Sequence, residues 1–421
     1  MTSVFDPIFY TLIFLAVYGQ VFYFVTFLEN RKKIVIRNGE IKLKYYPSIT
    51  VTVPCWNEES TVERTVQSLL DLNYPKDKLK IFLVDDGSVD NTWNILKKFT
   101  QYPNIQVFHK ENGGKHTAVN LGLENSSTDF FGCLDADSFV DPESLVRIMS
   151  YFEKDPEVMA VTPSLLVENP KNIIQNAQKV EYHMGVYLKK MLGFLGAINV
   201  TPGPLTIFRK KVFEDLGHYR NGHNTEDMEM AFRMQKNGYK IDHCNDAFVY
   251  TNTPVNFRKL FNQRVRWIYG FINNAFDYKS VLLRKKYGNF ATFTLPLAVI
   301  SVSSVVYLTS KMAYSFFNFL YNKFIQFRVV GFNFKIKNFT FDPFFINTQF
   351  IIFLAIFLYF LIIFAIIFGR KMSKEKKLFS FNILYFFPVF LIIAPLVLFK
   401  GIYNTLVSRK PDWRQGINSN Y

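Results

Sequence analysis

The sequence predicts an α/β protein in which a mostly parallel sheet carries helices on both faces, with transmembrane and interfacial helices attached. Three observations lead to this prediction. Long apolar segments stand near both ends of the 421-residue chain, short apolar runs alternate with amphipathic stretches between about residues 47 and 246, and polar clusters follow the first apolar runs. Strands that alternate with helices are typical of a parallel sheet, whose ligands collect at the carboxyl ends of the strands.

The first apolar segment, residues 8–28, is expected to be a transmembrane helix. Its 21 residues include one strongly polar side chain, Gln20, and a basic cluster at residues 31–33 follows. About 20 apolar residues span a bilayer, and basic residues favour the cytoplasmic side. A cleaved signal peptide is the competing interpretation. It is disfavoured because the basic cluster follows the apolar run and no small-residue cleavage site is evident.

A globular catalytic domain is expected over residues 45–250. Strands are predicted at residues 49–53, 80–84, 105–109 and 130–134, and helices at residues 58–72, 91–99, 115–124 and 142–152. A polar cluster follows each strand, and these clusters begin at Asn57, Asp85, Glu111 and Asp135. Because parallel strands end at the same edge of a sheet, the four loops should converge on one site.

Two of these clusters indicate binding chemistry. Asp135 and Asp137 leave a strand as carboxylates two residues apart, which are costly to bury unless a cation compensates them. Mg²⁺ or Mn²⁺, sharing its ligands with substrate phosphate, fits this pair. The stretch Gly113-Gly114-Lys115 offers amides and an ammonium to an anion. It lacks the full P-loop pattern, since His116 follows, and a nucleotide triphosphatase is therefore disfavoured.

For two further acidic clusters, both a structural and a functional interpretation remain open. The stretch Asp85-Asp86-Gly87-Ser88 suits a turn before a helix cap as well as a binding loop. Glu226 and Asp227 open a helix predicted at residues 227–236, where acids are favoured by the helix dipole in any case. A general base needs a carboxylate at such an edge, within reach of a hydroxyl.

The C-terminal third is expected to return to the membrane. An amphipathic interfacial helix is predicted at residues 256–274, and apolar segments follow at residues 290–319, 346–368 and 379–399. Pro388 and Pro395 interrupt the last segment. It could therefore cross the membrane with a kink, form a re-entrant segment, or lie in the membrane interface. The expected organisation is an N-terminal transmembrane helix at 1–30, the catalytic domain at 45–250, interfacial helices at 251–289, two or three crossings within 290–404, and a tail at 405–421.

Charge and cysteine content narrow the class of protein. The net charge is +15, and the basic residues cluster beside the hydrophobic segments and not on a separate domain. Anionic lipid headgroups explain this pattern better than nucleic acid does. Cys55, Cys133 and Cys244 show neither a disulfide framework nor a C-x-x-C metal spacing. We expect them to be reduced packing residues that face the cytosol.

The motifs also form an ordered series. It consists of the stretches 53–58 (VPCWNE), 84–88 (VDDGS), 113–115 (GGK), 135–137 (DAD), 203–204 (GP), 225–227 (TED) and 263–267 (QRVRW). The series resembles the processive membrane glycosyltransferases of family 2, such as cellulose, chitin, hyaluronan and poly-N-acetylglucosamine synthases. The resemblance covers about residues 47–270, and the ordered series is far more specific than any single motif.

The resemblance implies a GT-A fold that inverts configuration in one displacement, using a nucleotide sugar with UDP as its nucleotide. It implies that Asp227 is the general base and that Glu226 orients it. Gly203 and Pro204 would line the acceptor site, with Trp267 under the terminal sugar. The implied donor-binding residues are Cys55, Asn57, Glu58, Asp86, Lys115, Asp135, Gln263 and Arg266, and the implied metal ligands are Asp135 and Asp137.

The implied product is a growing β-linked polysaccharide, made at the plasma membrane by a cytoplasmic catalytic domain. Its partners would be the donor, a glycan or lipid-linked acceptor, membrane lipids, and a homodimer mate or accessory export subunit, because the membrane portion is small. One alternative is transfer of a single sugar to a polyprenyl-type lipid carrier or glycolipid. Another is a membrane scaffold or transporter component with a degenerate domain, which predicts a missing acid, whereas every acid of the series is present.

The family also has a loop with Trp and a basic residue that closes over the bound donor. The late candidate here is the stretch Pro411-Asp412-Trp413-Arg414. This stretch could close over the donor only if it lies in the cytosol. Therefore either residues 379–399 do not cross the membrane or the tail has no gating role.

Overall fold

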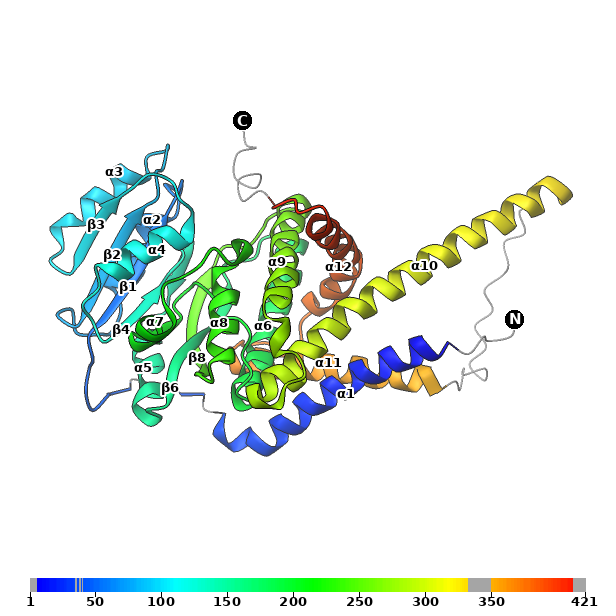
Figure 1. The fold of residues 1–421 in the computed structure, drawn as a ribbon, viewed down its shortest axis with the longest axis horizontal. Coiled ribbons are helices and arrows are strands. Elements are labelled where there is room, and N and C mark those ends of the chain that lie inside the picture. Colours follow the sequence, from blue (N-terminus) through cyan, green and yellow to red (C-terminus); the bar gives the residue numbers. More distant parts are fainter. Residues whose placement is uncertain (1–5, 35, 38, 40, 332–349, 412–421) are drawn as a thin grey trace.

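The computed structural model describes residues 6–34, 36–37, 39, 41–331 and 350–411. Within these residues, one eight-stranded sheet and its covering helices form a globular domain, and long helices project from one side of it (Figure 1). Asp412, Trp413 and Arg414 of the candidate gating stretch lie outside the described residues.

The first half of the sheet agrees with the sequence prediction. Its strands are β1 (Ile49–Cys55), β2 (Leu79–Asp85), β3 (Ile105–His109) and β4 (Phe130–Cys133), and its helices are α2 (Val62–Leu70), α3 (Thr92–Lys97) and α4 (Lys115–Glu124). The strands are all parallel, in the order β3-β2-β1-β4. Ile49, Val51 and Val53 of β1 are fully buried, and the strand is covered on both faces. Such near-continuous apolar strands are typical of parallel sheets.

The second half of the sheet was not predicted from the sequence. It contains β5 (Ser138–Val140), β6 (Val158–Val167), β7 (Ile207–Arg209) and β8 (Lys240–Thr251), in the order β4-β7-β6-β8-β5. β6 and β8 are parallel, whereas β7 and β5 are antiparallel to their neighbours. β8 escaped prediction because His243, Asn245 and Asp246 are fully buried in it and break its hydrophobic pattern.

The remaining helices cover the sheet and lead to the membrane. They are α5 (Ser144–Lys154), α6 (Ile173–Phe194), α7 (Lys211–Leu216), α8 (Glu226–Lys236) and α9 (Phe257–Asp277). Short 3-10 turns are η1 (Arg31–Lys33), η2 (Lys98–Gln101), η3 (Gly222–Asn224), η4 (Lys279–Val281) and η5 (Lys285–Tyr287), and a π-helical turn is η6 (Phe290–Thr294). Helix α9, which the sequence predicts to be interfacial, begins one residue after the predicted start and extends three residues beyond the predicted end.

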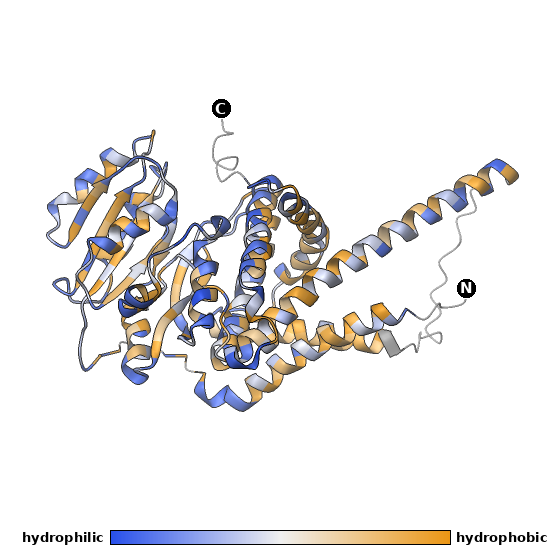
Figure 2. Cartoon of the chain, in the orientation of Figure 1, coloured by the Kyte–Doolittle hydropathy of each residue, from blue (hydrophilic) through white to orange (hydrophobic). Residues whose placement is uncertain are grey.

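Four described helices are long and apolar enough to cross a membrane, judged by length and composition. They are α1 (Pro7–Asn30), α10 (Leu295–Val330), α11 (Phe350–Met372) and α12 (Asn382–Leu406). Figure 2 shows α1, α10 and α11 as largely apolar rods that leave the more polar domain on the same side. Phe27 of α1 meets Phe368 of α11 edge to face with ring centroids 4.5 Å apart, so these two helices pack together.

Helix α12 packs lengthwise on α9. Its Ile393 and Val397 form a buried cluster with Leu260 and Val265 of α9, and farther along Asn273 Nδ2 donates a hydrogen bond of 3.2 Å to Thr405 Oγ1. Both prolines that were expected to interrupt this segment lie inside the helix. The final apolar segment therefore runs beside the interfacial helix, and the number of crossings stays a prediction.

Prediction for Gly369. A Cβ at Gly369 of α11 would lie 1.9 Å from the carbonyl oxygen of His183 in α6, so Gly369→Ala should push α11 off the catalytic domain. Overpacking of this kind costs about 1–3 kcal/mol, and we expect a lower thermal unfolding midpoint in detergent, followed by tryptophan fluorescence. Gly185→Ala is the matched control, because within the described chain a Cβ there meets no atom within 4 Å. Equal midpoints for both variants would contradict the close packing.

Candidate active site

The four loops predicted to converge do meet at the carboxyl edge of the sheet. Asn57, after β1, donates its backbone N–H to Ser88 Oγ at 3.0 Å, and its Oδ1 accepts from the Val89 N–H at 2.9 Å. These bonds join the loop after β1 to the loop after β2. Asn57 has a φ of 56°, a left-handed conformation that Asn tolerates better than most side chains. The tight turn therefore aims the next residue, Glu58, along the edge.

Asp86 is the anchor of the loop that follows β3. Its carboxylate accepts hydrogen bonds from the backbone N–H groups of Gly113 and Gly114 at 3.0 and 2.9 Å and from Lys110 Nζ at 2.6 Å. The glycine amides that were expected to face a ligand anion thus hold this carboxylate of the protein itself. Lys110 was missed in the sequence, where its only signal was a basic residue directly after a strand.

Lys115, the first residue of α4, joins two acidic clusters. Its ammonium lies 2.6 Å from Asp135 Oδ1 and 3.1 Å from Glu226 Oε1. Burial opposes protonation of Lys115, but the two carboxylates outweigh burial and hold its pKa above the usual range. This lysine therefore brings the end of β4 and the start of α8 into one site.

Gly203 packs directly against this ion pair. A Cβ at Gly203 would lie 2.5 Å from Lys115 Nζ and 2.9 Å from Asp135 Oδ1, so a side chain there would displace the pair. The next residues turn back to the sheet, where the Leu205 N–H donates to the Cys133 carbonyl oxygen. The structure thus brings the Gly203-Pro204 loop next to the acidic residues, as expected for a loop that lines the site.

The carboxylates at this edge raise each other's pKa values. Burial, followed by repulsion from Asp135, raises the pKa of Asp137 to about 6. Burial, followed by repulsion from Asp137, raises the pKa of Glu58 to about 7. Such mutual repulsion favours a bound cation. In the described part of the chain no three His, Cys, Asp or Glu side chains gather as a metal cage, so protein ligands alone do not complete a metal site.

Asp227 stands at the start of α8 with a perturbed carboxyl group. Burial, followed by repulsion from Glu226, raises its pKa to about 6. Glu226 shows the opposite shift, because although burial opposes its ionisation, the Lys115 ammonium lowers its pKa. Two adjacent carboxyl groups with pKa values moved in opposite directions are typical of an acid–base site.

Helix α9 clamps the loop that precedes these acids. Arg266 Nη1 donates to the Asn224 carbonyl oxygen at 2.8 Å, and Asn274 Nδ2 donates to the Gly222 carbonyl oxygen at 3.0 Å and to Thr225 Oγ1 at 3.0 Å. Asn224 adopts a left-handed φ of 64°, which is uncommon for a side chain other than glycine. The helix that carries the Q-x-x-R-W motif therefore fixes the loop leading to Asp227.

Three other residues of the Q-x-x-R-W motif, Gln263, Arg264 and Trp267, differ in their contacts. Arg264 Cζ lies 4.0 Å from the centre of the Trp267 ring, and Arg264 Nη2 lies 2.6 Å from Glu181 Oε2 of α6. Among the residues that the structure describes, no group forms a hydrogen bond with the buried Gln263 Oε1. Arg264 and Glu181 were missed because the motif pattern leaves its second position variable, and Glu181 is far away in sequence.

Two more observations complete the site. Lys189 of α6 was also missed; burial lowers its pKa to about 8, while the charge of Asp227 acts to raise it. The Cys55 side chain is fully buried, and its Sγ donates to the Val53 carbonyl oxygen at 3.4 Å. Its own carbonyl oxygen accepts a hydrogen bond of 2.8 Å from the Asp86 N–H, so Cys55 lies beside the predicted donor residues and its contact with the donor stays a prediction.

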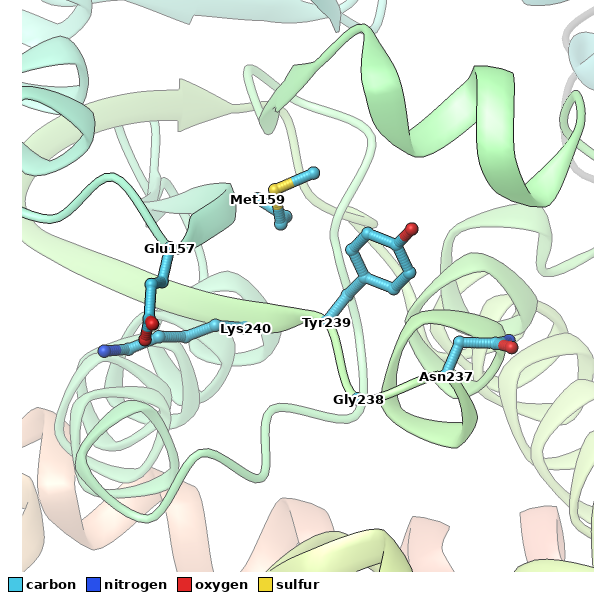
Figure 3. A pocket seen from close by; sticks show the side chains of 6 residues that line it. All are labelled: Glu157, Met159, Asn237, Gly238, Tyr239 and Lys240. Atoms are coloured by element: carbon cyan, nitrogen blue, oxygen red, sulfur yellow. The ribbon is translucent and has the colours of Figure 1, made fainter.

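A separate hollow of about 360 Å³ lies at the opposite edge of the sheet, where β6 and β8 begin. Figure 3 shows its lining, which consists of Glu157, Met159, Asn237, Gly238, Tyr239 and Lys240. It contains none of the residues predicted for the site. Ligands of parallel sheets collect at the carboxyl edge, so this hollow is not the candidate active site.

Comparison with known proteins agrees with the geometry at the carboxyl edge. Residues 50–217 match the model of the family "Glycosyl transferase family 2". The chain carries a family 2 glycosyltransferase domain. It is 29% identical over 299 residues, 70% of each chain, to a poly-beta-1,6-N-acetyl-D-glucosamine synthase of Staphylococcus aureus strain COL. It is 28% identical over 302 residues, 70% of this chain and 71% of the other, to the protein of the same name from Staphylococcus epidermidis.

The fold also has a solved counterpart. The glycosyltransferase superimposes on the mannosyltransferase PcManGT from Pyrobaculum calidifontis with a TM-score of 0.60, over 94% of this chain and 99% of the other. At 17% identity, this likeness concerns the fold alone. It confirms the predicted GT-A type of sheet. With its four apolar helices, the glycosyltransferase is an integral membrane protein.

Prediction for Gly270. A Cβ at Gly270 of α9 would lie 2.2 Å from Thr225 Oγ1 and 2.4 Å from its methyl carbon, so Gly270→Ala should shift α9 away from the loop before Asp227. Because small displacements of catalytic groups cost large factors in rate, we expect kcat/KM for sugar transfer to fall by at least about tenfold. Gly185→Ala should leave it unchanged. Full activity of Gly270→Ala, in protein that remains folded, would show that the clamp does not position the site.

Proposed function

We propose that this glycosyltransferase extends a β-linked polymer of N-acetylglucosamine from UDP-N-acetylglucosamine. The observation that carries the proposal is the clamp between the Q-x-x-R-W helix and the loop before Asp227, with Arg266 Nη1 2.8 Å from the Asn224 carbonyl oxygen. This contact supports the proposal because α9 also carries Trp267, which is assigned to the acceptor, and the clamped loop leads directly to Asp227, the proposed base. The two staphylococcal relatives, whose names state a poly-N-acetylglucosamine product, support this choice of sugar and polymer.

Asp227 is the proposed general base. It takes the proton from the acceptor hydroxyl while that oxygen attacks the anomeric carbon and the bond to the UDP diphosphate breaks, so one displacement inverts the configuration. A pKa of about 6 leaves Asp227 largely ionised at neutral pH yet more basic than an ordinary aspartate. Glu226 raises that pKa by its charge, and Lys115 holds Glu226 in place at 3.1 Å.

The nucleotide is proposed to bind along the loops after β1, β2 and β3. Asp86 would accept a hydrogen bond from the base ring, since a carboxylate has about four lone-pair sites and three protein donors reach this one. Asn57 and Glu58 form the adjoining wall. Arg266 and Gln263 would face the leaving diphosphate, whose oxygens match a guanidinium and an amide as partners.

Asp135 and Asp137 are the proposed ligands of Mg²⁺ or Mn²⁺. Burial, followed by repulsion from Asp135, raises the pKa of Asp137, which is in keeping with a pair that a cation would stabilise even though Lys115 contacts Asp135 at 2.6 Å. Two carboxylates plus phosphate oxygens suit these hard cations, which retain open positions. When bound, the ion would stabilise negative charge on the departing diphosphate. Manganese in the complex of the structurally similar mannosyltransferase is in keeping with this choice.

The acceptor is proposed to lie between the Gly203-Pro204 loop and Trp267. Gly203 touches the Lys115–Asp135 pair, and Trp267 stands one residue beyond Arg266 on α9. An indole face packs well against the apolar face of a sugar ring. Arg264 stacks on the indole with Cζ 4.0 Å from its ring centre, and this contact would hold the ring in one orientation.

The catalytic domain is proposed to lie in the cytoplasm, at the plasma membrane. The basic turn after α1 (Arg31–Lys33) and the basic pair at the end of α11 (Arg370, Lys371) both lie at helix ends next to the domain, and positive residues favour the cytoplasmic side. The domain limits given above, and a homodimer mate or export subunit, remain part of this proposal.

Prediction for Asp227. Membranes containing the protein should incorporate sugar from radiolabelled UDP-N-acetylglucosamine into a ladder of products that a β-hexosaminidase degrades. Asp227→Asn should lower the rate at least about a thousandfold because the proton acceptor is lost, while UDP binding stays within about threefold. A single lipid-soluble product would favour transfer to a lipid carrier. Full activity of Asp227→Asn would make the assignment of the base wrong.

Prediction for the pH profile. With a base of pKa about 6, kcat/KM should fall about tenfold per pH unit below pH 6 and level off above it. The profile is measured at saturating Mg²⁺, so that the metal competes with protons for Asp137. Because Glu226 raises the pKa of Asp227, Glu226→Gln should move this acidic limb to lower pH. If the acidic limb of the profile does not move in Glu226→Gln, it reports the titration of a group other than Asp227.

A further inference from the structure

A basic cavity of about 440 Å³ lies where α11 ends and the chain turns toward α12. It is separate from the proposed catalytic residues. Its charged lining residues are Lys179, Arg370, Lys374, Glu375, Lys376 and Lys377, five basic side chains and one acidic one. An excess of positive charge in one hollow favours an anion as its ligand.

Arg370 is the buried centre of this cavity. The residue is 3% exposed, and within the described ranges neither its Nε nor its Nη1 has a hydrogen-bond partner. A buried guanidinium nitrogen without a partner is costly, so such groups normally meet an acceptor. A phosphate presents paired oxygens that match the guanidinium fork. The arginine therefore points to a ligand that carries a phosphate group.

The one acid in the cavity offsets part of its positive charge, because Glu375 pairs with Lys179 of the lining and its charge also reaches Arg370, which leaves an excess of basic groups. Glu375 Oε1 lies 2.5 Å from Lys179 Nζ and 3.6 Å from His183 Nε2, both on α6. Lys374 Nζ likewise donates to the Arg37 carbonyl oxygen at 2.5 Å. Lys376 and Lys377 are exposed at the rim, where they can reach a ligand that enters from the surface.

The position of the cavity indicates that the phosphate belongs to a lipid. The apolar span of α11 ends at Met372, so the cavity lies at the level where headgroups meet the catalytic domain. Beside its lining residue Ser380, Phe379 is 73% exposed and Phe381 is 80% exposed. Exposed phenylalanines next to a basic hollow suit acyl chains beside a headgroup, whereas a soluble phosphate gains nothing from them.

We propose that this cavity binds the phosphate of an anionic phospholipid. Arg370 is its buried contact, and Lys376 and Lys377 hold the headgroup from the rim. The bound lipid bridges α11 to the start of α12 and to Lys179 of α6. It thus joins the membrane helices to the catalytic domain, whichever sugar the enzyme transfers.

The test measures lipid binding to the purified full-length protein in a neutral detergent. Native mass spectrometry follows the binding of dioleoyl-phosphatidylglycerol, with dioleoyl-phosphatidylcholine as the zwitterionic lipid for comparison. Arg370→Gln should weaken phosphatidylglycerol binding about tenfold, because a charge-assisted hydrogen bond is lost. Lys371→Gln is the matched control, since it removes the same charge from the next residue of α11, whose ammonium lies over the Phe368 ring at 5.7 Å.

A second variant is needed because Arg370→Gln alters a buried residue and could disturb the fold. Lys376→Gln combined with Lys377→Gln alters exposed residues and should weaken phosphatidylglycerol binding by at least about threefold. Equal losses in Arg370→Gln and Lys371→Gln, unchanged binding in the double rim variant, or equally tight phosphatidylcholine binding would overturn the proposal. Complete displacement of the lipid by inorganic phosphate or glycerol phosphate would assign the cavity to a soluble anion and overturn its assignment to a lipid.

Discussion

The Lys115 ammonium is the interaction on which the site depends. It lies 2.6 Å from Asp135, at the end of β4, and 3.1 Å from Glu226, at the start of α8. One buried cation thus attracts a carboxylate that follows β4 and another that begins α8, and it reduces the repulsion between them. Removing a partner from such a buried group leaves an uncompensated charge, and for this reason the cluster is coupled as a whole. Gly203 is small because the loop that carries it must approach this pair closely.

The same cluster sets the electrostatics of its neighbours. Glu226 is kept ionised by Lys115 and, as a charged neighbour, raises the pKa of Asp227. Asp135 in the same way raises the pKa of Asp137. Burial, followed by these neighbouring charges, thus raises the pKa of both Asp227, the proposed base, and Asp137, a proposed metal ligand, to about 6. The two proposed roles differ with the neighbours of each group, since the charge of Arg266 on α9 acts on Asp227 and the charge of Asp137 acts on Glu58 in the loop after β1.

The membrane helices contribute to the site through α9. This helix fixes the loop before Asp227 on one side and packs on α12 on the other, while α11 rests on α6 through Gly369. The described chain ends at Pro411, whose carbonyl oxygen accepts a hydrogen bond of 3.4 Å from Asn224 Nδ2 in the clamped loop. Changes in the packing of α12 therefore act on the loop next to the catalytic centre, and a lipid beside α11 stabilises the same junction.

The sequence by itself determined the family 2 motifs, the first four strands and the apolar helices. Those strands are short, apolar and followed by turns, so local pattern was enough, and the acids and the Q-x-x-R-W motif were visible as residue types. Only the tertiary structure decided that β8 is a central strand with buried His243, Asn245 and Asp246, that Cys55 points into the core, and that Asp86 is held by glycine amides. It also revealed Arg264, Glu181 and Lys110 as partners. These outcomes depend on contacts between residues far apart in the chain, which no local periodicity encodes.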